Sequence, residues 1–193
     1  MRVTPQSEWI DNDSQPARRI VVLGSPGSGK TTFSRMLAAT LDLPHINLDD
    51  LYWLAGWRRS TQVDFLNRLE LAVSEVAWII DGNYQSCLSI RLKRADTVIV
   101  LDVAPWRCAL RAFIRALRRM GGESVNLPKA IAAETYYRHL PVPDMRFWRL
   151  ILNFRRQTLP AMKAEIAAAQ NVRAITLSGT EEIIAFLAAT EHQ

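Results

Sequence analysis

Residues 24–31 combine glycines, a lysine and a threonine at a spacing that suits the binding of a phosphate chain. They read Gly-Ser-Pro-Gly-Ser-Gly-Lys-Thr and match the pattern GxxxxGK[ST] in full. Glycines let the backbone curl so that its N–H groups point at a phosphate, and a following helix adds roughly half a positive charge at its N-terminus. The segment predicts a nucleotide site built from Gly24, Ser25, Pro26, Gly27, Ser28, Gly29, Lys30, Thr31 and Thr32.

Two side chains of this phosphate loop have distinct predicted tasks. Lys30 can reach the β- and γ-phosphates of a nucleotide, and the Thr31 hydroxyl can coordinate Mg²⁺. The alternative is a glycine-rich turn that matches by accident, which ordinary residue frequencies give in roughly one chain in a hundred of this length. A predicted strand before the loop and a predicted helix after it favour phosphate binding.

Three aspartates are candidates for the chemistry beside the loop. Phosphoryl transfer depends on positioning and charge neutralisation, so a carboxylate is needed near the metal ion. Asp81 follows a short apolar segment and is the natural acid for the Mg²⁺ shell; its alternative role is that of a turn former. Asp49 and Asp50 could bind the acceptor or Mg²⁺, or act as base toward an acceptor hydroxyl. Alternatively, one of them caps a helix and the other is a solvated acid.

Arginines recur along one predicted helix, over residues 105–120. Their spacings of four, four and three form one stripe, and no acid lies between Asp102 and Glu123. Solvated helix faces usually mix both signs of charge, so the stripe favours contact with an anion over a merely solvated face. It comprises Arg107, Arg111, Arg115 and Arg118, opposite the apolar Trp106, Leu110, Phe113, Ile114 and Leu117. Arg155 and Arg156 begin a second candidate clamp with weaker support.

Aromatic side chains follow the acid pair closely, at Tyr52, Trp53 and Trp57. They could line an acceptor pocket or stack on a base, or they could form a small hydrophobic cluster of their own. The three histidines are scattered in no metal-ligand spacing, so no metal is assigned to them.

The elements that must position these residues alternate from Arg18 onward. Continuous apolar segments predict strands that are buried on both faces, over 20–23, 45–48, 78–80, 97–103 and 173–177. Helices are predicted over 30–41, 105–120, 145–154, 160–170 and 180–189. Such alternation implies an α/β fold, with a five-stranded parallel sheet in the order 2-3-1-4-5 and helices on both faces.

One further helix is predicted from a capping box. Thr61 and Asp64 have the spacing of such a box, and the helix that they open would place its apolar side chains on one face. These are Phe65, Leu69, Ala72 and Val76.

The length of the chain favours a single domain. Its 193 residues and 21.9 kDa suit one α/β unit over residues 18–193, preceded by a mobile extension over 1–17. Within the unit, we expect an acceptor-side region over about 49–76 and a lid-like excursion over about 116–156.

Composition narrows the classes of function further. Nothing in the chain is apolar enough to span a bilayer or to act as a secretory signal, so we expect a cytoplasmic protein without a membrane partner. Two cysteines in no CxxC spacing argue against a disulfide framework. Residues 104–160 carry a net charge of +8 within a chain of +5, which suits an anionic partner, either a nucleotide or a nucleic acid.

With these motifs in hand, the chain resembles the P-loop kinases of the adenylate kinase and shikimate kinase group. More closely it resembles the bacterial topology modulation proteins, a nucleoside-monophosphate-kinase-like family. The resemblance rests on the phosphate loop and on the segments HINLDDLYWLAGW, WIIDGNY and ADTVIVLDVAPWRC. It implies the P-loop NTPase fold, a lid, ATP as donor and Mg²⁺ as cofactor.

The resemblance carries over to some residues and fails at others. In adenylate kinases the third strand ends in Asp-Gly-Phe-Pro-Arg; here Asp81 and Gly82 match, but the AMP-site arginine is missing, which argues against AMP as acceptor. The two lid-side arginines that pack on adenine correspond to Arg111 and Arg115. Shikimate kinases use acids after the second strand for metal and acceptor, which resembles Asp49 and Asp50.

The leading hypothesis is an ATP- and Mg²⁺-dependent kinase that phosphorylates a small acceptor, either a nucleoside monophosphate or a hydroxylated metabolite. Lys30, Asp49, Asp50, Arg111 and Arg115 are the predicted catalytic residues, and Thr31 and Asp81 the predicted metal residues. Two alternatives remain open: an ATP-binding protein that acts on or with DNA, and a nucleotide-binding regulator without turnover.

Overall fold

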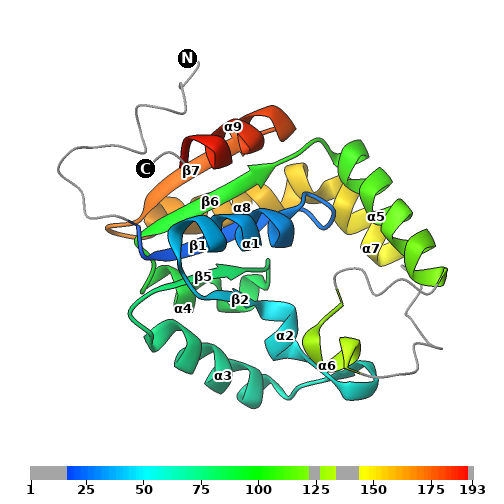
Figure 1. Ribbon diagram of the computed structural model, residues 1–193, viewed down its shortest axis with the longest axis horizontal. Coiled ribbons are helices and arrows are strands. Elements are labelled where there is room, and N and C mark those ends of the chain that lie inside the picture. The colour runs from blue at the N-terminus through cyan, green and yellow to red at the C-terminus, as the bar shows by residue number, and fades with distance from the viewer. Residues whose placement is uncertain (1–16, 122–126, 134–143, 191–193) are drawn as a thin grey trace.

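The strand segments that the sequence predicts pair into one parallel sheet. In the computed structural model, which describes residues 17–121, 127–133 and 144–190, this sheet has five strands in the order β2-β5-β1-β6-β7 (Figure 1). All four pairings are parallel. The strands are β1 Arg19–Gly24, β2 His45–Asn47, β5 Trp78–Asp81, β6 Thr97–Asp102 and β7 Arg173–Ser178.

The predicted α/β fold with a five-stranded parallel sheet is confirmed. Counted along the chain within this sheet alone, the strand order reads 2-3-1-4-5. The strand labels β1–β7 differ from this count because they include two short strands that were not predicted. These strands, β3 (Trp53–Leu54) and β4 (Arg58–Arg59), pair as a separate antiparallel ribbon.

Helices cover both faces of the sheet, as predicted. One face carries α1 (Lys30–Leu41) and α9 (Thr180–Thr190), and the other carries α3 (Gln62–Ser74), α4 (Leu88–Leu92) and α8 (Leu159–Ala168). Figure 1 shows α1 and α9 on the near side of the sheet, with α4 and α8 behind it.

The burial of β1 explains why its residues 20–23 are all apolar. Ile20 and Val22 pack into the cluster beneath α1 and α9, while Val21 and Leu23 pack into the cluster on the opposite face. Because both faces of a central parallel strand are covered, no position along it can be polar without losing solvation.

The basic helix α5 (Pro105–Met120) packs on α7 (Met145–Asn153) beside the sheet. It begins at a proline, whose fixed φ suits the first helical turn, and ends at Gly121. The buried contacts of this pair are Val103, Cys108, Ala112 and Ile151.

Short elements complete the described part of the chain. They are α2 Leu48–Tyr52, η1 Ala55–Trp57, η2 Gln85–Cys87, α6 Lys129–Ala132 and the π-helical turn η3 Phe154–Thr158, which joins α7 to α8. The predicted extension over 1–17 lies outside the described residues except for Ala17, and so does part of the predicted excursion over 116–156.

The structure corrects two local predictions. The strand predicted over 45–48 ends one residue earlier, at Asn47, whose side chain caps α2, so Asp49 and Asp50 lie in the first turn of that helix. The capping box at Thr61 is confirmed, but Val76 lies beyond the end of α3 and is exposed, so the buried positions of this helix are Phe65, Leu69 and Val73.

Two expectations from composition can be compared with the described residues. Cys87 and Cys108 are both buried and free. Within the described ranges, no helix has both the length and the apolar character needed to cross a membrane.

Candidate active site

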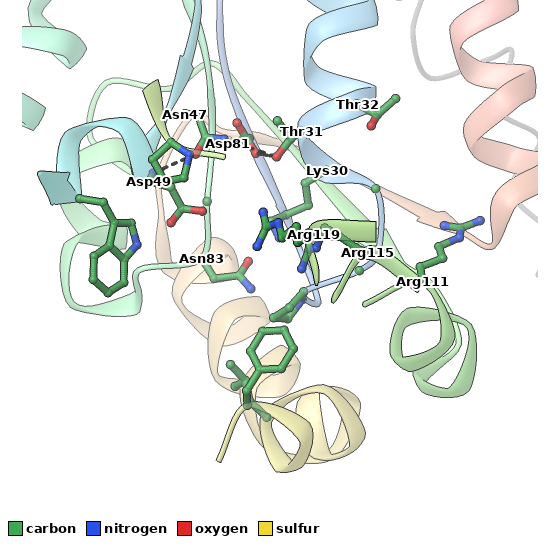
Figure 2. A pocket seen from close by; sticks show the side chains of 18 of the residues that line it. Lys30, Thr31, Thr32, Asn47, Asp49, Asp81, Asn83, Arg111, Arg115 and Arg119 are labelled. Atoms are coloured by element: carbon green, nitrogen blue, oxygen red, sulfur yellow. Dashed lines mark hydrogen bonds between the residues drawn. The ribbon is translucent and has the colours of Figure 1, made fainter. Parts of the chain in front are cut away.

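The predicted site residues meet at the carboxyl edge of the sheet. The phosphate loop follows β1, α2 follows β2, Asp81 ends β5, and α5 follows β6. They surround a pocket of about 740 Å³ (Figure 2). Because the carboxyl ends of parallel strands share one edge, the sheet brings together residues that lie far apart in the sequence.

Contact with α5 requires a glycine at the tip of the phosphate loop. Gly27 has a φ of 83°, and a Cβ at this position would collide with the carbonyl group of Cys108. Gly29, with a φ of 95°, precedes the first residue of α1. The loop is therefore shaped by its own glycines and by the first turn of α5.

Lys30 points from the start of α1 into the pocket (Figure 2). Within the part of the chain that the structure describes, its ammonium group donates one long hydrogen bond, of 3.4 Å, to the carbonyl of Ser25. Burial lowers the pKa of Lys30, and the nearby Asp81 and Asp49 oppose that shift. A phosphate bound beside this ammonium group would replace the solvation that it has lost.

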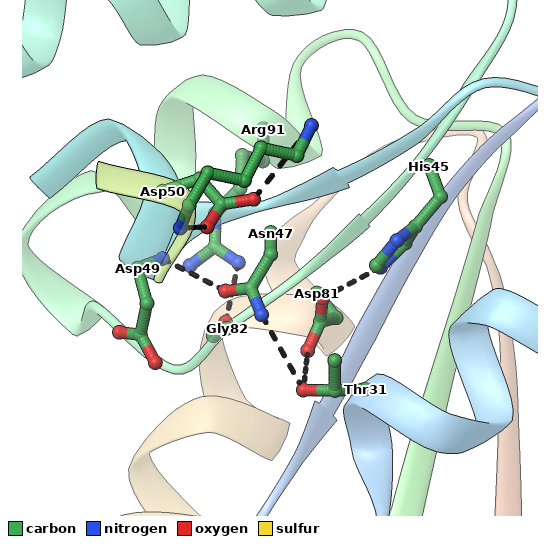
Figure 3. A network of polar contacts seen from close by, with 9 residues as sticks. Thr31, His45, Asn47, Asp49, Asp50, Asp81, Gly82 and Arg91 are labelled. Carbon is green, nitrogen blue, oxygen red and sulfur yellow. Dashed lines mark hydrogen bonds and ion pairs between the residues drawn. The ribbon is translucent and has the colours of Figure 1, made fainter. Parts of the chain in front are cut away.

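Asp81 is the centre of a buried polar network (Figure 3). One carboxylate oxygen accepts a 2.7 Å hydrogen bond from the Thr31 hydroxyl, and the other lies 2.8 Å from Nε2 of His45. Asn47 contributes a 3.5 Å contact from its side-chain amide to the Thr31 oxygen. The two predicted metal residues, Thr31 and Asp81, are thus adjacent.

The oxygen ligands around Asp81 fit Mg²⁺. A hydroxyl and a carboxylate are oxygen ligands of the kind that Mg²⁺ prefers, with phosphate oxygens and water completing its shell. No group of three or more metal-ligating side chains occurs among the described residues, so the protein alone supplies no closed cage. Thr31 and Asp81 would hold the ion only together with a bound nucleotide.

The structure separates the two adjacent acids that the sequence treats alike. Asp49 is exposed to the pocket and accepts a 2.7 Å hydrogen bond from the Tyr84 hydroxyl. Asp50 turns away from it, accepts a 2.8 Å hydrogen bond from the backbone N–H of Lys129, and lies 4.0 Å from the Lys129 ammonium group. Asp50 therefore joins α2 to α6 and does not line the pocket.

A buried arginine that the sequence analysis missed organises the loop after Asp81. Arg91 is fully buried, and its guanidinium donates to the carbonyls of Gly82 at 2.7 Å and Tyr84 at 3.2 Å (Figure 3 shows Arg91 beside Gly82). Burial lowers the pKa of Arg91. The same loop touches the phosphate loop, because Asn83 accepts a 3.2 Å hydrogen bond from the N–H of Gly24.

The arginines of α5 divide into groups with different surroundings. Arg111 donates to the carbonyl of Ser28 in the phosphate loop at 3.3 Å and to the Thr180 hydroxyl at 3.1 Å. Arg115 and Arg119 lie close to Lys30 in Figure 2, and Arg118 also lines the pocket. Arg107 does not line it.

Desolvation acts on the two inner guanidiniums of α5. Burial lowers the pKa of Arg115, and burial together with the charge of Arg115 lowers the pKa of Arg119 to about 10. Asp49 opposes both shifts. Arg119 was missed as a site residue, although its spacing of four from Arg115 could have placed it on the same side of the helix.

Of the remaining aromatic and arginine candidates, some line the pocket and others do not. Trp53 and Trp57 line the pocket, whereas Tyr52 packs on Phe65 and on Tyr84 at the edge of the core. Arg155 is paired with Asp102 at 2.6 Å and does not line the pocket, so the second candidate clamp is not part of this site.

Comparisons with known proteins agree with this geometry. The chain is 31% identical over 118 residues to adenylate kinase 1 of a Nostoc species, and 25% identical over 109 residues to an adenylate kinase of an Anaeromyxobacter species. These alignments cover 58% and 55% of this chain and 62% and 50% of the relatives, so the chain spans less than two thirds of either relative. No family model matches the chain.

Solved structures show the same fold over nearly the whole chain. A shikimate kinase from Acinetobacter baumannii in complex with shikimate has a TM-score of 0.54 at 16% identity, covering 91% of this chain and 92% of that one. A shikimate kinase from Bacteroides thetaiotaomicron has a TM-score of 0.50 at 17% identity, covering 91% and 97%. The chain is thus similar to adenylate kinases over somewhat more than half of its length, and it shares the fold of the shikimate kinases.

Proposed function

We propose that this P-loop nucleoside-monophosphate-kinase-like chain transfers the γ-phosphate of ATP to a small anionic acceptor. One observation carries the proposal: a single pocket holds the phosphate loop, the Thr31–Asp81 pair and, facing them, the exposed carboxylate of Asp49. Donor phosphates, metal ion and acceptor would therefore meet in one pocket, as positioning-driven phosphoryl transfer requires.

The donor side assigns a task to each of its residues. Backbone N–H groups of residues 24–32 would cradle the phosphates, and Lys30 would neutralise charge on the transferred group. Thr31 and Asp81 would hold Mg²⁺, which when bound neutralises phosphate charge. Arg111, already bonded to the loop carbonyl of Ser28, would flank the nucleotide from α5.

On the acceptor side, Asp49 is the candidate base. It would accept the proton of an acceptor hydroxyl as that oxygen bonds to the γ-phosphorus and the bond to the β-phosphate oxygen breaks, which releases ADP. Tyr84 holds one carboxylate oxygen through its hydroxyl and leaves the other to face the pocket. Asp50 is not part of the proposed catalytic set, because its carboxylate accepts a hydrogen bond from the backbone N–H of Lys129 in α6.

The balance of charge in the pocket supports an anionic acceptor. Among the described residues, Lys30 and four arginines of α5 line it, against the carboxylates of Asp49 and Asp81. Since Mg²⁺-bound ATP carries a net charge of about −2, a positive excess remains for a further anion. Trp53 and Trp57 offer apolar surface to the rest of that molecule.

The experiment is a phosphoryl-transfer assay with ATP against a panel of nucleoside monophosphates and hydroxy acids, each paired with its uncharged analogue. Lys30→Ala is the blank. The proposal expects one anionic acceptor to turn over above the blank while its uncharged analogue does not. If every acceptor stays at background although ATP binds, the proposal is wrong and a nucleotide-binding regulator takes its place.

Association with DNA is the weaker alternative. The basic segment motivates it, but most of the arginine stripe on α5 lines the pocket and does not form a free outer surface. Each phosphate contact would steepen the salt dependence of duplex binding by about 0.9 in log–log slope. Absence of binding to duplex DNA at low salt eliminates this alternative.

A further inference from the structure

The outer side of α5 carries a continuous apolar stripe that the described chain leaves uncovered. Its members are all at least half exposed, from 50% for Phe113 to 75% for Met120. Stripes of this extent are uncommon on monomeric proteins and mark interaction surfaces. They are Trp106, Leu110, Phe113, Leu117 and Met120.

The spacing of this stripe is that of a helix-pairing seam. Successive members are four, three, four and three residues apart, which is the heptad spacing that keeps one side of a helix turned toward a partner helix. Core contact with α7 uses another side of α5, through Cys108 and Ala112. Figure 1 shows α5 at the edge of the molecule with α7 beside it, and the seam side chains are exposed among the described residues.

We propose that this seam pairs antiparallel with the same seam of a second copy of the chain. In the register that pairs the a positions of one helix with the d positions of the other, Leu110 packs against Phe113 of the partner subunit. Trp106 then packs against Leu117 of the partner subunit. The same contacts recur on the other side of the two-fold axis, as an isologous interface requires.

The residues that flank the seam are compatible with packing against α5 of a second copy of the chain. On one side the flanking residues are small: Ala116, and Ala109, which also packs against the cluster shared with α7, so a second helix can approach closely. On the other side the antiparallel register places Arg107 next to Ile114 of the partner subunit, and no arginine faces an arginine. The ring of Trp106 already lies under the Arg107 guanidinium, 5.2 Å from ring centroid to carbon, so that charge has a local partner.

The area is sufficient for a reversible dimer. Two of the five side chains are aromatic, with roughly 150–250 Å² each to bury, and the other three are smaller aliphatic ones; at half exposure or more, the five offer at most roughly 500 Å² per copy, below the ~800 Å² per partner of a standard interface. The arginines that line the pocket lie across the helix from the seam, so pairing does not cover them; Ile114, at the flank of the seam, is the point where the interface meets the pocket. The proposal holds whether or not the chain is a kinase.

The first test is the mass of the full chain in solution, measured by light scattering over a range of concentrations. We expect twice the 21.9 kDa of one copy at high concentration. Leu110→Glu and Leu117→Glu should each weaken the dimer about 100-fold, because every substitution enters the symmetric interface twice. The matched control is Leu71→Glu, at a 71% exposed leucine of α3, which should leave the dimer intact.

The second test is the register, measured by cross-linking. Under mild oxidation, the double variant Trp106→Cys/Leu117→Cys should form a covalent dimer, whereas Leu117→Cys alone should not, since this residue faces itself only in a parallel pair. A chain that stays monomeric, or a dimer that Leu110→Glu leaves unchanged, overturns the proposal. So does a monomer whose seam instead binds vesicles of anionic lipid.

Discussion

The two halves of the pocket are built in different ways. Most of the donor half is one contiguous segment, residues 24–32, to which the fold adds Asp81 and Arg111. The acceptor half is assembled from separate segments: Asp49 from α2, Trp53 and Trp57, Tyr84 after β5, and the other pocket arginines of α5. A contiguous site depends on local backbone geometry, whereas an assembled site depends on the contacts that hold its segments together.

Those contacts are few and can be named. Arg91 fixes the carbonyls of the loop after Asp81, and the Tyr84 hydroxyl connects that loop to Asp49. Asp50 joins α2 to α6 through the N–H of Lys129. Substitutions on the donor side should therefore change ATP binding, and substitutions among these contacts should change turnover at unchanged ATP affinity.

The largest effect is expected for Lys30→Ala. Loss of a charged hydrogen-bonding partner, worth about 1.5–3 kcal/mol, predicts roughly a 10- to 100-fold loss of ATP affinity. Turnover should fall further, by about 100-fold, because the same ammonium group faces charge that develops during transfer. Calorimetric titration with Mg²⁺-ATP measures the affinity, with the exposed Lys93→Ala as control. Unchanged ATP binding would place the donor site elsewhere.

Arg91→Met should have the next largest effect, on stability. It leaves the carbonyls of Gly82 and Tyr84 buried without their donor, which should lower the free energy of unfolding by about 2–4 kcal/mol. Urea denaturation measures this change. Arg91→Lys, which keeps the charge but offers fewer directed donors, should lose part of that stability and part of the turnover while ATP affinity stays the same. Full stability in Arg91→Met would show that the loop holds its shape without Arg91.

Tyr84→Phe is expected to have the smallest of these effects. It removes only the hydroxyl that holds Asp49, a hydrogen bond to a charged group worth about 1.5 kcal/mol, which corresponds to roughly a tenfold loss of turnover. The aromatic packing against Tyr52 and Phe65 is retained, so the unfolding transition should not move. Equal loss of ATP affinity and turnover would remove the distinction between the two halves.

Sequence patterns predicted the donor half and the sheet because their signals are local. The phosphate loop is a contiguous motif, and buried parallel strands are recognisable as apolar runs. The helix bounds of α1 and α5 follow from a glycine before the first and from a proline and a glycine at the two ends of the second.

The acceptor half escaped prediction because tertiary contacts decide it. Nothing in the pair Asp49-Asp50 shows which acid faces the pocket, since α6, about 80 residues later, captures Asp50. Arg91 resembles any surface arginine until the fold buries it against three carbonyls of the loop. The apolar side of α5 is clear in the sequence, but only the structure shows that it stays exposed.

The most direct test of a pocket divided between donor and acceptor compares Asp49→Asn with Asp50→Asn. For a hydroxy acid that turns over in the panel, we expect Asp49→Asn to lower turnover by about 10²- to 10⁴-fold, the usual contribution of a general base, with ATP affinity unchanged. Asp50→Asn, one residue away and outside the pocket, should retain turnover within about tenfold. Retained turnover in Asp49→Asn, or equal losses in the two variants, would contradict the account.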